Sequence, residues 1–140
     1  MNIIHIRNKS GYKTEIDTRG HLFLADEPID TGGTDTAASP YEMFLSSLGS
    51  CKAITMRMYA QRKNYKLDEI EIELSHQKIN AEDCADCETK AGTIDKIDIK
   101  VRFKGELNDD EIKRLLEISE RCPVQKTVMS EVKINTNIFS

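Results

Sequence analysis

The sequence contains no long uninterrupted apolar run. Its most apolar stretch, residues 43–48, is broken by Ser46 and Ser47 and is far too short to cross a bilayer. The first thirteen residues alternate apolar and polar side chains and lack the apolar core of a signal peptide. We therefore expect a cytoplasmic protein that does not contact a membrane.

An excess of positive charge is also missing. The sequence has 20 Lys and Arg residues and 24 Asp and Glu residues. The resulting net charge of −4 argues against a nucleic-acid partner, which requires a basic patch on the protein. The polar loop at residues 31–36 lacks the Gly-Lys-Ser/Thr ending and the Gly-x-Gly-x-x-Gly spacing of phosphate-binding loops. With 140 residues and 39% hydrophobic content, the chain is predicted to form a single globular domain over residues 1–140.

Strands are predicted wherever apolar and polar residues alternate, because one face of a half-buried strand meets the core and the other meets water. The clearest alternation is at Ile70–Ser75 and Ile97–Lys104. Weaker signals complete the set of predicted strands: residues 3–6, 12–17 and 22–24, and a closing strand at Val132 and Ile134.

A long helix is predicted to begin at Ser39-Pro40. Serine is a good N-cap, proline fits the first turn, and Glu42 completes a capping box, so the helix should run to about residues 63–64. Spacings of three and four residues place one apolar stripe on it: Phe44, Leu48, Cys51, Thr55 and Met58. This stripe puts Cys51 in the middle of the predicted buried face.

A second helix is predicted after Asn108, with Glu111 forming another capping box. It should stop at Cys122 because Pro123 disfavours helical geometry in the preceding residue, and a short new turn over residues 124–128 can follow. The pattern predicts an α+β fold with a mostly antiparallel sheet, a long central helix and a second helix.

Cys51 and Cys122 lie on the inward faces of the two predicted helices. Periodicity leaves open whether Cys51 is a packed core thiol or a reactive one, which would need a nearby cation such as Lys13, Arg19 or a residue of a partner chain. Cys122 follows a helix C-terminus, where the dipole disfavours a thiolate, so it suits a resolving cysteine or a core residue. If the two helices pack together, their sulfurs could come within disulfide reach, a geometry that the sequence allows without requiring it.

Cys84 and Cys87 form a Cys-x-x-Cys pair in an acidic segment. Four carboxylates there disfavour a thiolate and therefore a thioredoxin-like role: Glu82, Asp83, Asp86 and Glu88. A closed zinc site needs four ligands, to which His76 could contribute a third. We take an inert loop as the default interpretation, with metal binding or a local disulfide as the alternatives.

Two motifs resemble those of a known family. Residues 39–45, Ser-Pro-Tyr-Glu-Met-Phe-Leu, and residues 48–51, Leu-Gly-Ser-Cys, resemble the signature that opens the central helix of the OsmC/organic hydroperoxide resistance (Ohr) family. Residues 122–124, Cys-Pro-Val, resemble the second signature of that family, and the likeness extends from about residue 25 to residue 134. One departure is that the Ohr branch has its glutamate ten residues before the cysteine, where this chain has Tyr41.

The resemblance implies an OsmC-like fold, an intertwined homodimer and a thiol-dependent peroxidase of oxidative-stress defence. Cys51 would attack the hydroperoxide and Cys122 would resolve the product, with Arg19 activating the thiol and Glu42 supporting Arg19. No metal or organic cofactor is expected, and an external dithiol, for example a dihydrolipoyl group, would restore the thiols. Because the neighbours of Cys51 are apolar, we expect organic hydroperoxides as substrates.

Two other functions stay open at this level. A non-enzymatic dimeric module could keep the fold and bind an apolar ligand. A metal-binding protein could instead use Cys84, Cys87 and His76.

Overall fold

The computed structural model describes residues 3–139, and the chain divides into two compact units, Met1–Ser46 and Ser47–Ser140. The boundary falls inside the long helix α1 (Pro40–Arg62), which begins in the first unit and continues through the second. The expectation of one domain over residues 1–140 stays a prediction. No helix of the described part of the chain is long and apolar enough to span a membrane.

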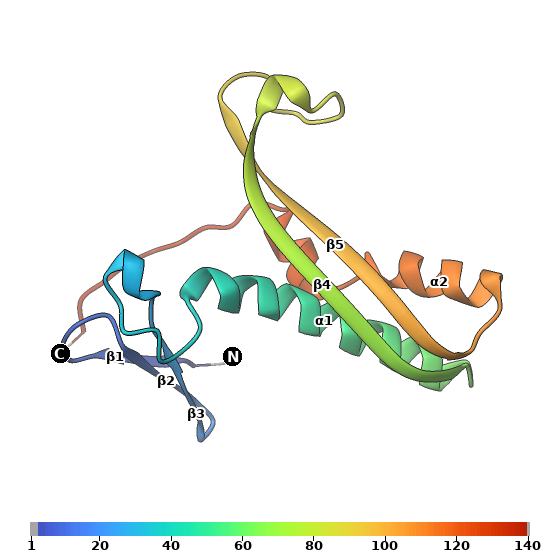
Figure 1. Cartoon of the computed structure of the whole chain (residues 1–140), viewed down its shortest axis with the longest axis horizontal. Coiled ribbons are helices and arrows are strands. Elements are labelled where there is room, and N and C mark those ends of the chain that lie inside the picture. The colour runs from blue at the N-terminus through green and yellow to red at the C-terminus, as the bar shows by residue number, and fades with distance from the viewer. Residues whose placement is uncertain (1–2, 140) are drawn as a thin grey trace. The chain divides into compact units, whose positions relative to one another are not determined.

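The first unit contains a three-stranded antiparallel sheet in the order β1–β2–β3 (Figure 1). Its strands are β1 (His5–Asn8), β2 (Thr14–Thr18) and β3 (His21–Ala25), which confirms the three strands predicted in this part of the sequence to within about two residues. The tight turn between β2 and β3 is made by Arg19 and Gly20, both with positive φ angles.

The loop after β3 is held by the buried carboxylate of Asp26. That carboxylate accepts hydrogen bonds from the hydroxyl of Thr34 at 2.6 Å, from the hydroxyl of Thr36 at 2.9 Å and from the N–H of Glu27 at 2.8 Å. These bonds, with that of Thr34 foremost, hold the pKa of Asp26 well below its usual range despite burial. An internal carboxylate therefore orders this polar loop, which includes the 3₁₀ turn Ile29–Thr31.

Helix α1 starts with the predicted capping box. The N–H of Ser39 donates to Glu42 Oε1 at 2.9 Å, and the N–H of Glu42 donates to Ser39 Oγ at 3.2 Å. The helix ends at Arg62 and is followed by Asn64 in the left-handed region, close to the predicted end at residues 63–64.

The second unit packs helices against a long hairpin. The hairpin strands are β4 (Lys66–Asn80) and β5 (Thr93–Glu106), joined by the 3₁₀ turn Ala81–Asp83, and Figure 1 shows them crossing α1. Helix α2 (Asp109–Ser119) begins with the predicted capping box of Asn108 and Glu111. The core joins α1, β4 and α2 through one cluster: Met56, Tyr59, Ala60, Leu67, Leu115 and Ile118.

The α+β class and the antiparallel pairing are confirmed, but the five strands form two separate sheets. The closing strand predicted at Val132 and Ile134 is wrong for the single chain. Residues 131–139 have no regular secondary structure, and Ile134 is 82% exposed. An extended segment becomes a strand only when it pairs with a sheet edge, and among residues 3–139 no strand pairs with this one.

The predicted buried stripe of α1 is also partly wrong. Met58 is 64% exposed and Cys51 is half-buried, whereas Lys52, the next residue, is buried. The reason is that α1 carries apolar side chains around most of its circumference, so their spacing does not single out one face. The residues of α1 that are buried form a different set: Leu48, Gly49, Lys52, Met56, Tyr59 and Ala60.

Candidate active site

Cys51 and Cys122 meet within the second unit. Cys51 lies in the middle of α1, and Cys122 lies between α2 and the short helix α3 (Pro123–Val128). Both thiols are free, and their side chains interact so that each shifts the pKa of the other. Cys122 is fully buried and Cys51 only partly, so Cys51 is the sulfur that an incoming molecule can reach.

The first turn of α3 directs two backbone N–H groups toward these sulfurs. The N–H of Gln125 donates to Cys122 Sγ at 3.5 Å, and the backbone of Val124 lies close enough to Cys51 to lower the pKa of its thiol. The turn is the one that the sequence predicted after Pro123. The sequence pattern did not indicate that its N–H groups would face the two sulfurs, because the prediction for Cys122 rested on the unfavourable C-terminal end of the preceding helix.

The two thiols have pKa values displaced in opposite directions. Burial raises the pKa of Cys51, but the hydrogen bonds from Cys122 and Val124, a contact with Thr55 and the charge of Lys52 outweigh it, so the pKa lies below its ordinary value. Burial raises the pKa of Cys122, and its hydrogen bond to Cys51 raises it further. Cys51 is thus the thiol that ionises first, with Cys122 as its proton-bearing neighbour.

The cation of the site is Lys52, which the sequence analysis missed. Its side chain is 3% exposed, and its ammonium donates to the backbone oxygen of Ser119 at 3.1 Å and to the side-chain oxygen of Gln125. Glu120 Oε1 lies 3.7 Å from Nζ and is itself mostly exposed. One ammonium therefore joins α1 to the end of α2 and to α3, the two elements that flank Cys122.

A signal for Lys52 was present in the sequence. Leu48, Lys52, Met56 and Tyr59 follow one another at spacings of 4, 4 and 3, and all four are buried on α1. A single lysine on an apolar stripe indicates a buried charge that requires partners. Those partners come from residues about 70 positions later, so the sequence alone could not identify them.

The other predicted activators lie in the first unit. Arg19 is exposed on the β2–β3 turn, and Lys13 is exposed just before β2. The carboxylate of Glu42 accepts the N–H of Ser39 in the helix cap. The roles assigned to Arg19 and Glu42 stay predictions.

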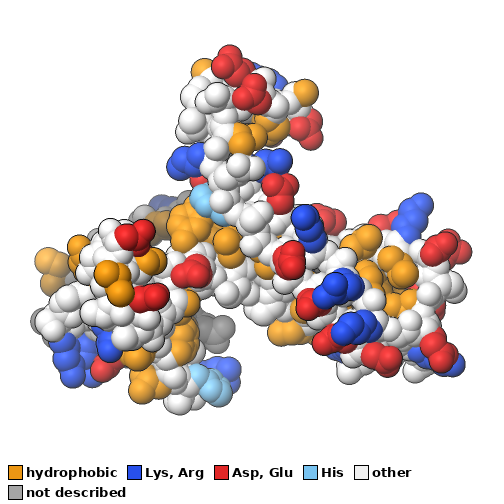
Figure 2. All heavy atoms as spheres, in the orientation of Figure 1, with side chains coloured by type: hydrophobic (Ala, Val, Ile, Leu, Met, Phe, Trp, Pro, Cys, Tyr) orange, Lys and Arg blue, Asp and Glu red, His pale blue; other side chains and the backbone are white. Residues whose placement is uncertain are grey.

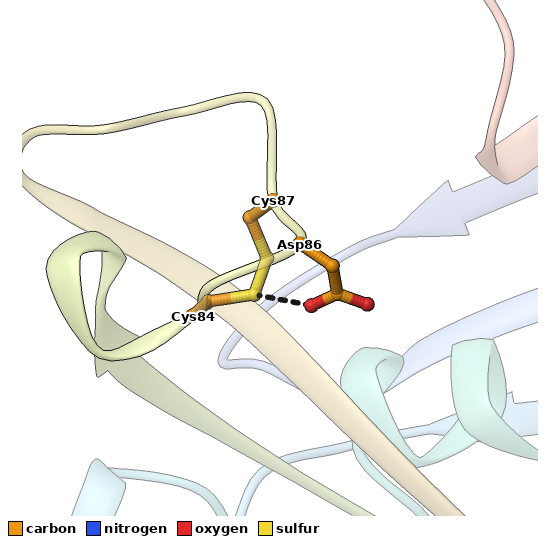
Figure 3. Close-up of side chains that lie close together, drawn as sticks. All are labelled: Cys84, Asp86 and Cys87. Atoms are coloured by element: carbon orange, nitrogen blue, oxygen red, sulfur yellow. Dashed lines mark hydrogen bonds between the residues drawn. A yellow bond between two sulfur atoms is a disulfide. The ribbon is translucent and has the colours of Figure 1, made fainter.

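Cys84 and Cys87 are joined by a disulfide at the end of the β4–β5 hairpin, which is the local pairing considered as an alternative to an inert loop (Figure 3). Asp86 lies beside them and forms with the two sulfurs a group whose ligand atoms are all within 4.8 Å of one another. His76 lies on β4 with its Nε2 2.8 Å from Asp95 Oδ1, and it is not a member of that group.

Comparison with known families gives one match that covers most of the chain. The family model described as OsmC-like protein matches residues 33–137. This segment includes both motifs, the Cys84-x-x-Cys87 segment and Lys52. No curated protein sequence matches the chain.

Solved structures share the fold at low sequence identity. An OsmC like protein from Mycoplasma pneumoniae is 20% identical with a TM-score of 0.72, and the match covers 99% of this chain and 96% of that one. A putative osmotic stress induced and detoxification response protein from Psychrobacter arcticus 273-4 is 21% identical with a TM-score of 0.72, covering 90% and 87%. The organic hydroperoxide resistance protein OhrB of Bacillus subtilis is 19% identical with a TM-score of 0.60, covering 92% and 90%.

Proposed function

Because this chain belongs to the OsmC-like protein family, we propose that it is a thiol-dependent hydroperoxide reductase with Cys51 as nucleophile and Cys122 as resolving thiol. The observation that carries the proposal is the interacting pair of free cysteines, a partly buried Cys51 and a buried Cys122, beside the buried ammonium of Lys52. The low pKa of Cys51 supports the nucleophilic role, because the thiolate is the reactive form.

In the first step, the Cys51 thiolate attacks one oxygen of the hydroperoxide and the O–O bond breaks. The sulfur keeps an OH group as a sulfenic acid, and the other oxygen takes up a proton and leaves as an alcohol. Lys52 favours the thiolate electrostatically. Arg19, supported by Glu42, is a proposed second cation for the same thiolate.

In the second step, the Cys122 thiol condenses with the sulfenic acid, which forms a Cys51–Cys122 disulfide and releases water. An external dithiol then reduces this disulfide by exchange and leaves as its own disulfide. The interaction of the two thiols supports this pairing, because each is near enough to shift the pKa of the other before oxidation. The proposed chemistry uses no bound metal or organic cofactor.

Organic hydroperoxides are the proposed substrates. Two solved relatives, from Legionella pneumophila and Bacillus subtilis, are described as organic hydroperoxide resistance proteins. The nucleophile is partly buried and follows buried Leu48 on its helix, a setting that favours an apolar peroxide over hydrogen peroxide. The cytoplasm remains the proposed location, and a dihydrolipoyl group remains the proposed type of reductant.

The test is a titration of the reduced Cys84→Ser/Cys87→Ser protein, which retains only Cys51 and Cys122, with cumene hydroperoxide. One equivalent is expected to consume both thiols, and peptide mass spectrometry should find Cys51 joined to Cys122. In a Cys122→Ser version the reaction should stop at a sulfenic acid that dimedone traps on Cys51. If both thiols survive excess cumene hydroperoxide, the enzyme proposal fails and the apolar ligand-binding module takes its place.

We further infer that the working form is a homodimer. Large apolar side chains are exposed in both units and on the C-terminal segment, and orange areas mark such side chains over much of the surface in Figure 2. The most exposed of them are Leu22, Ile29, Met58, Met129, Ile134, Ile138 and Phe139. Monomeric proteins rarely leave so much apolar surface in water, and a second copy is the occupant that the family resemblance implies.

Light scattering on the purified protein is expected to give about twice the chain mass of 15.9 kDa. Ile134→Glu should weaken the dimer by at least about tenfold, because it puts a charge on an apolar residue of the C-terminal segment. Lys133→Glu, which introduces the same carboxylate at the preceding position, where the side chain is already charged and exposed, is the control. A wild-type protein that stays monomeric at micromolar concentration contradicts the inference.

A further inference from the structure

The tip of the β4–β5 hairpin contains a second pair of cysteines, outside the candidate active site. Cys84 and Cys87 have Cα atoms 5.5 Å apart, and Cys84 Sγ lies 3.3 Å from Asp86 Oδ1. Figure 3 shows the Asp86 carboxylate turned toward the disulfide. Two sulfurs and a carboxylate oxygen thus converge from four consecutive residues.

The backbone around this group is fixed by its own hydrogen bonds. The N–H of buried Ala81 donates to the oxygen of Gly92 at 2.8 Å, which closes the tip just beyond the last strand pair, Asn80 and Thr93. The N–H of Cys84 donates to the oxygen of Ala81 at 3.1 Å. The loop that carries the sulfurs is therefore built on the rigid end of a long hairpin.

The charge of the tip is strongly negative. Acidic side chains gather at the top of Figure 2, where the exposed carboxylates come from a single short segment: Glu82, Asp83, Asp86 and Glu88. This charge disfavours two bare thiolates, which argues against a nucleophilic dithiol. A bound cation reverses this effect, because it neutralises the thiolates and is itself attracted by the carboxylates. The acidic segment therefore disfavours a redox role and favours a metal site.

We propose that the reduced hairpin tip binds a zinc-type divalent cation through Cys84, Cys87 and Asp86. Two sulfurs and one carboxylate oxygen match the ligands that Zn²⁺ accepts, whereas Mg²⁺ and Ca²⁺ take oxygen ligands. Neighbouring carboxylates or water complete a tetrahedron. Ligands on a tetrahedral zinc ion place two sulfurs about 3.8 Å apart, a separation reached by side-chain rotation with the backbone unchanged.

The disulfide is the closed, metal-free form of this site. An external dithiol reduces it by transferring two electrons and two protons, which yields the Cys84 and Cys87 thiols and the oxidised dithiol. The cation then displaces two protons and binds both thiolates. Metal binding at the tip is thus controlled by the redox state of one cysteine pair, and it extends beyond the proposed peroxide chemistry.

The experiment is a Co²⁺ titration of the full chain after reduction with a phosphine and anaerobic removal of the reductant. The reduced protein is expected to bind one equivalent of Co²⁺ with thiolate-to-cobalt charge-transfer absorption and the visible bands of a tetrahedral ion. One equivalent of Zn²⁺ should bleach these bands. It should also protect Cys84 and Cys87 from alkylation while Cys51 remains reactive.

Two variants and the oxidised protein serve as controls. Cys84→Ser/Cys87→Ser and the protein with the disulfide intact should lose the signal, and Asp86→Asn should weaken binding about 10- to 100-fold. The proposal is overturned if the reduced wild type gives no more charge-transfer signal than Cys84→Ser/Cys87→Ser. The readout involves no peroxide, so its failure leaves the proposed reductase function unaffected.

Discussion

Replacing Cys51 with serine is expected to slow the reduction of cumene hydroperoxide by on the order of a thousandfold or more. A serine hydroxyl does not ionise at neutral pH and does not form a sulfenic acid, so the covalent route is removed completely. The substitution changes one atom of a half-buried side chain, and we expect the fold to be kept. The measurement is the initial rate of peroxide loss with an excess of an external dithiol.

Cys122→Ser is the informative partner of this variant, because the nucleophile stays in place. It should still consume the first equivalent of peroxide rapidly and lose only the formation of the internal disulfide. A Cys51→Ser protein that consumes peroxide as fast as the wild type would end the proposal. If the Cys122→Ser protein converts its Cys51 sulfenic acid to a disulfide as fast as the wild type does, Cys122 is not the resolving thiol.

Replacing Lys52 with methionine is expected to raise the pKa of Cys51, because it removes a positive charge that favours the thiolate. The rate of peroxide reduction at pH 7 should fall by at least about twofold, because less Cys51 is present as thiolate. The direction follows from the Lys52 charge, which lowers the pKa of Cys51 in the wild type. The difference in rate between the Lys52→Met protein and the wild type should shrink as the pH rises above the Cys51 pKa of both proteins. The check is the pH dependence of Cys51 alkylation, followed by peptide mass spectrometry.

Two further variants separate an electrostatic role of Lys52 from a structural one. Glu120→Gln removes the exposed carboxylate that lies 3.7 Å from Lys52 Nζ, so the alkylation midpoint of Cys51 should move to lower pH, opposite to Lys52→Met. Lys63→Met removes an exposed charge just beyond α1 and should leave the midpoint unchanged. If Lys52→Met lowers only the thermal stability and leaves the midpoint in place, Lys52 is merely a structural anchor.

Much of the fold could be read from local patterns. The capping boxes of Ser39 and Glu42 and of Asn108 and Glu111 set both helix starts, since they depend on residues three positions apart. The strand at Val132 was predicted by the same kind of local pattern, yet it does not form in the single chain. A strand requires a pairing edge, and no local pattern reports whether one is available.

Part of the site could also be predicted from local patterns, and the part that depends on distant residues could not. Motif and helix periodicity pointed to Cys51 and Cys122 as neighbours, and in the structure the two thiols interact. The activating cation was sought on the early strands, whereas Lys52 stands next to Cys51 in the sequence. Adjacent helical residues point about 100° apart, so the position of Lys52 beside Cys51 in the sequence does not by itself indicate a contact, and only the length of the lysine side chain makes one feasible.

The interaction of the two free thiols before oxidation limits how far the protein must move during turnover. Bonded sulfurs lie about 2 Å apart, so closing the disulfide requires the two side chains to approach to that distance within the second unit. The ammonium of Lys52 donates hydrogen bonds to the backbone oxygen of Ser119 and to the side chain of Gln125, and neither bond involves the two sulfurs. The spent and the ready protein should then present nearly the same outer surface, and a reductant that tells them apart must probe the sulfurs directly.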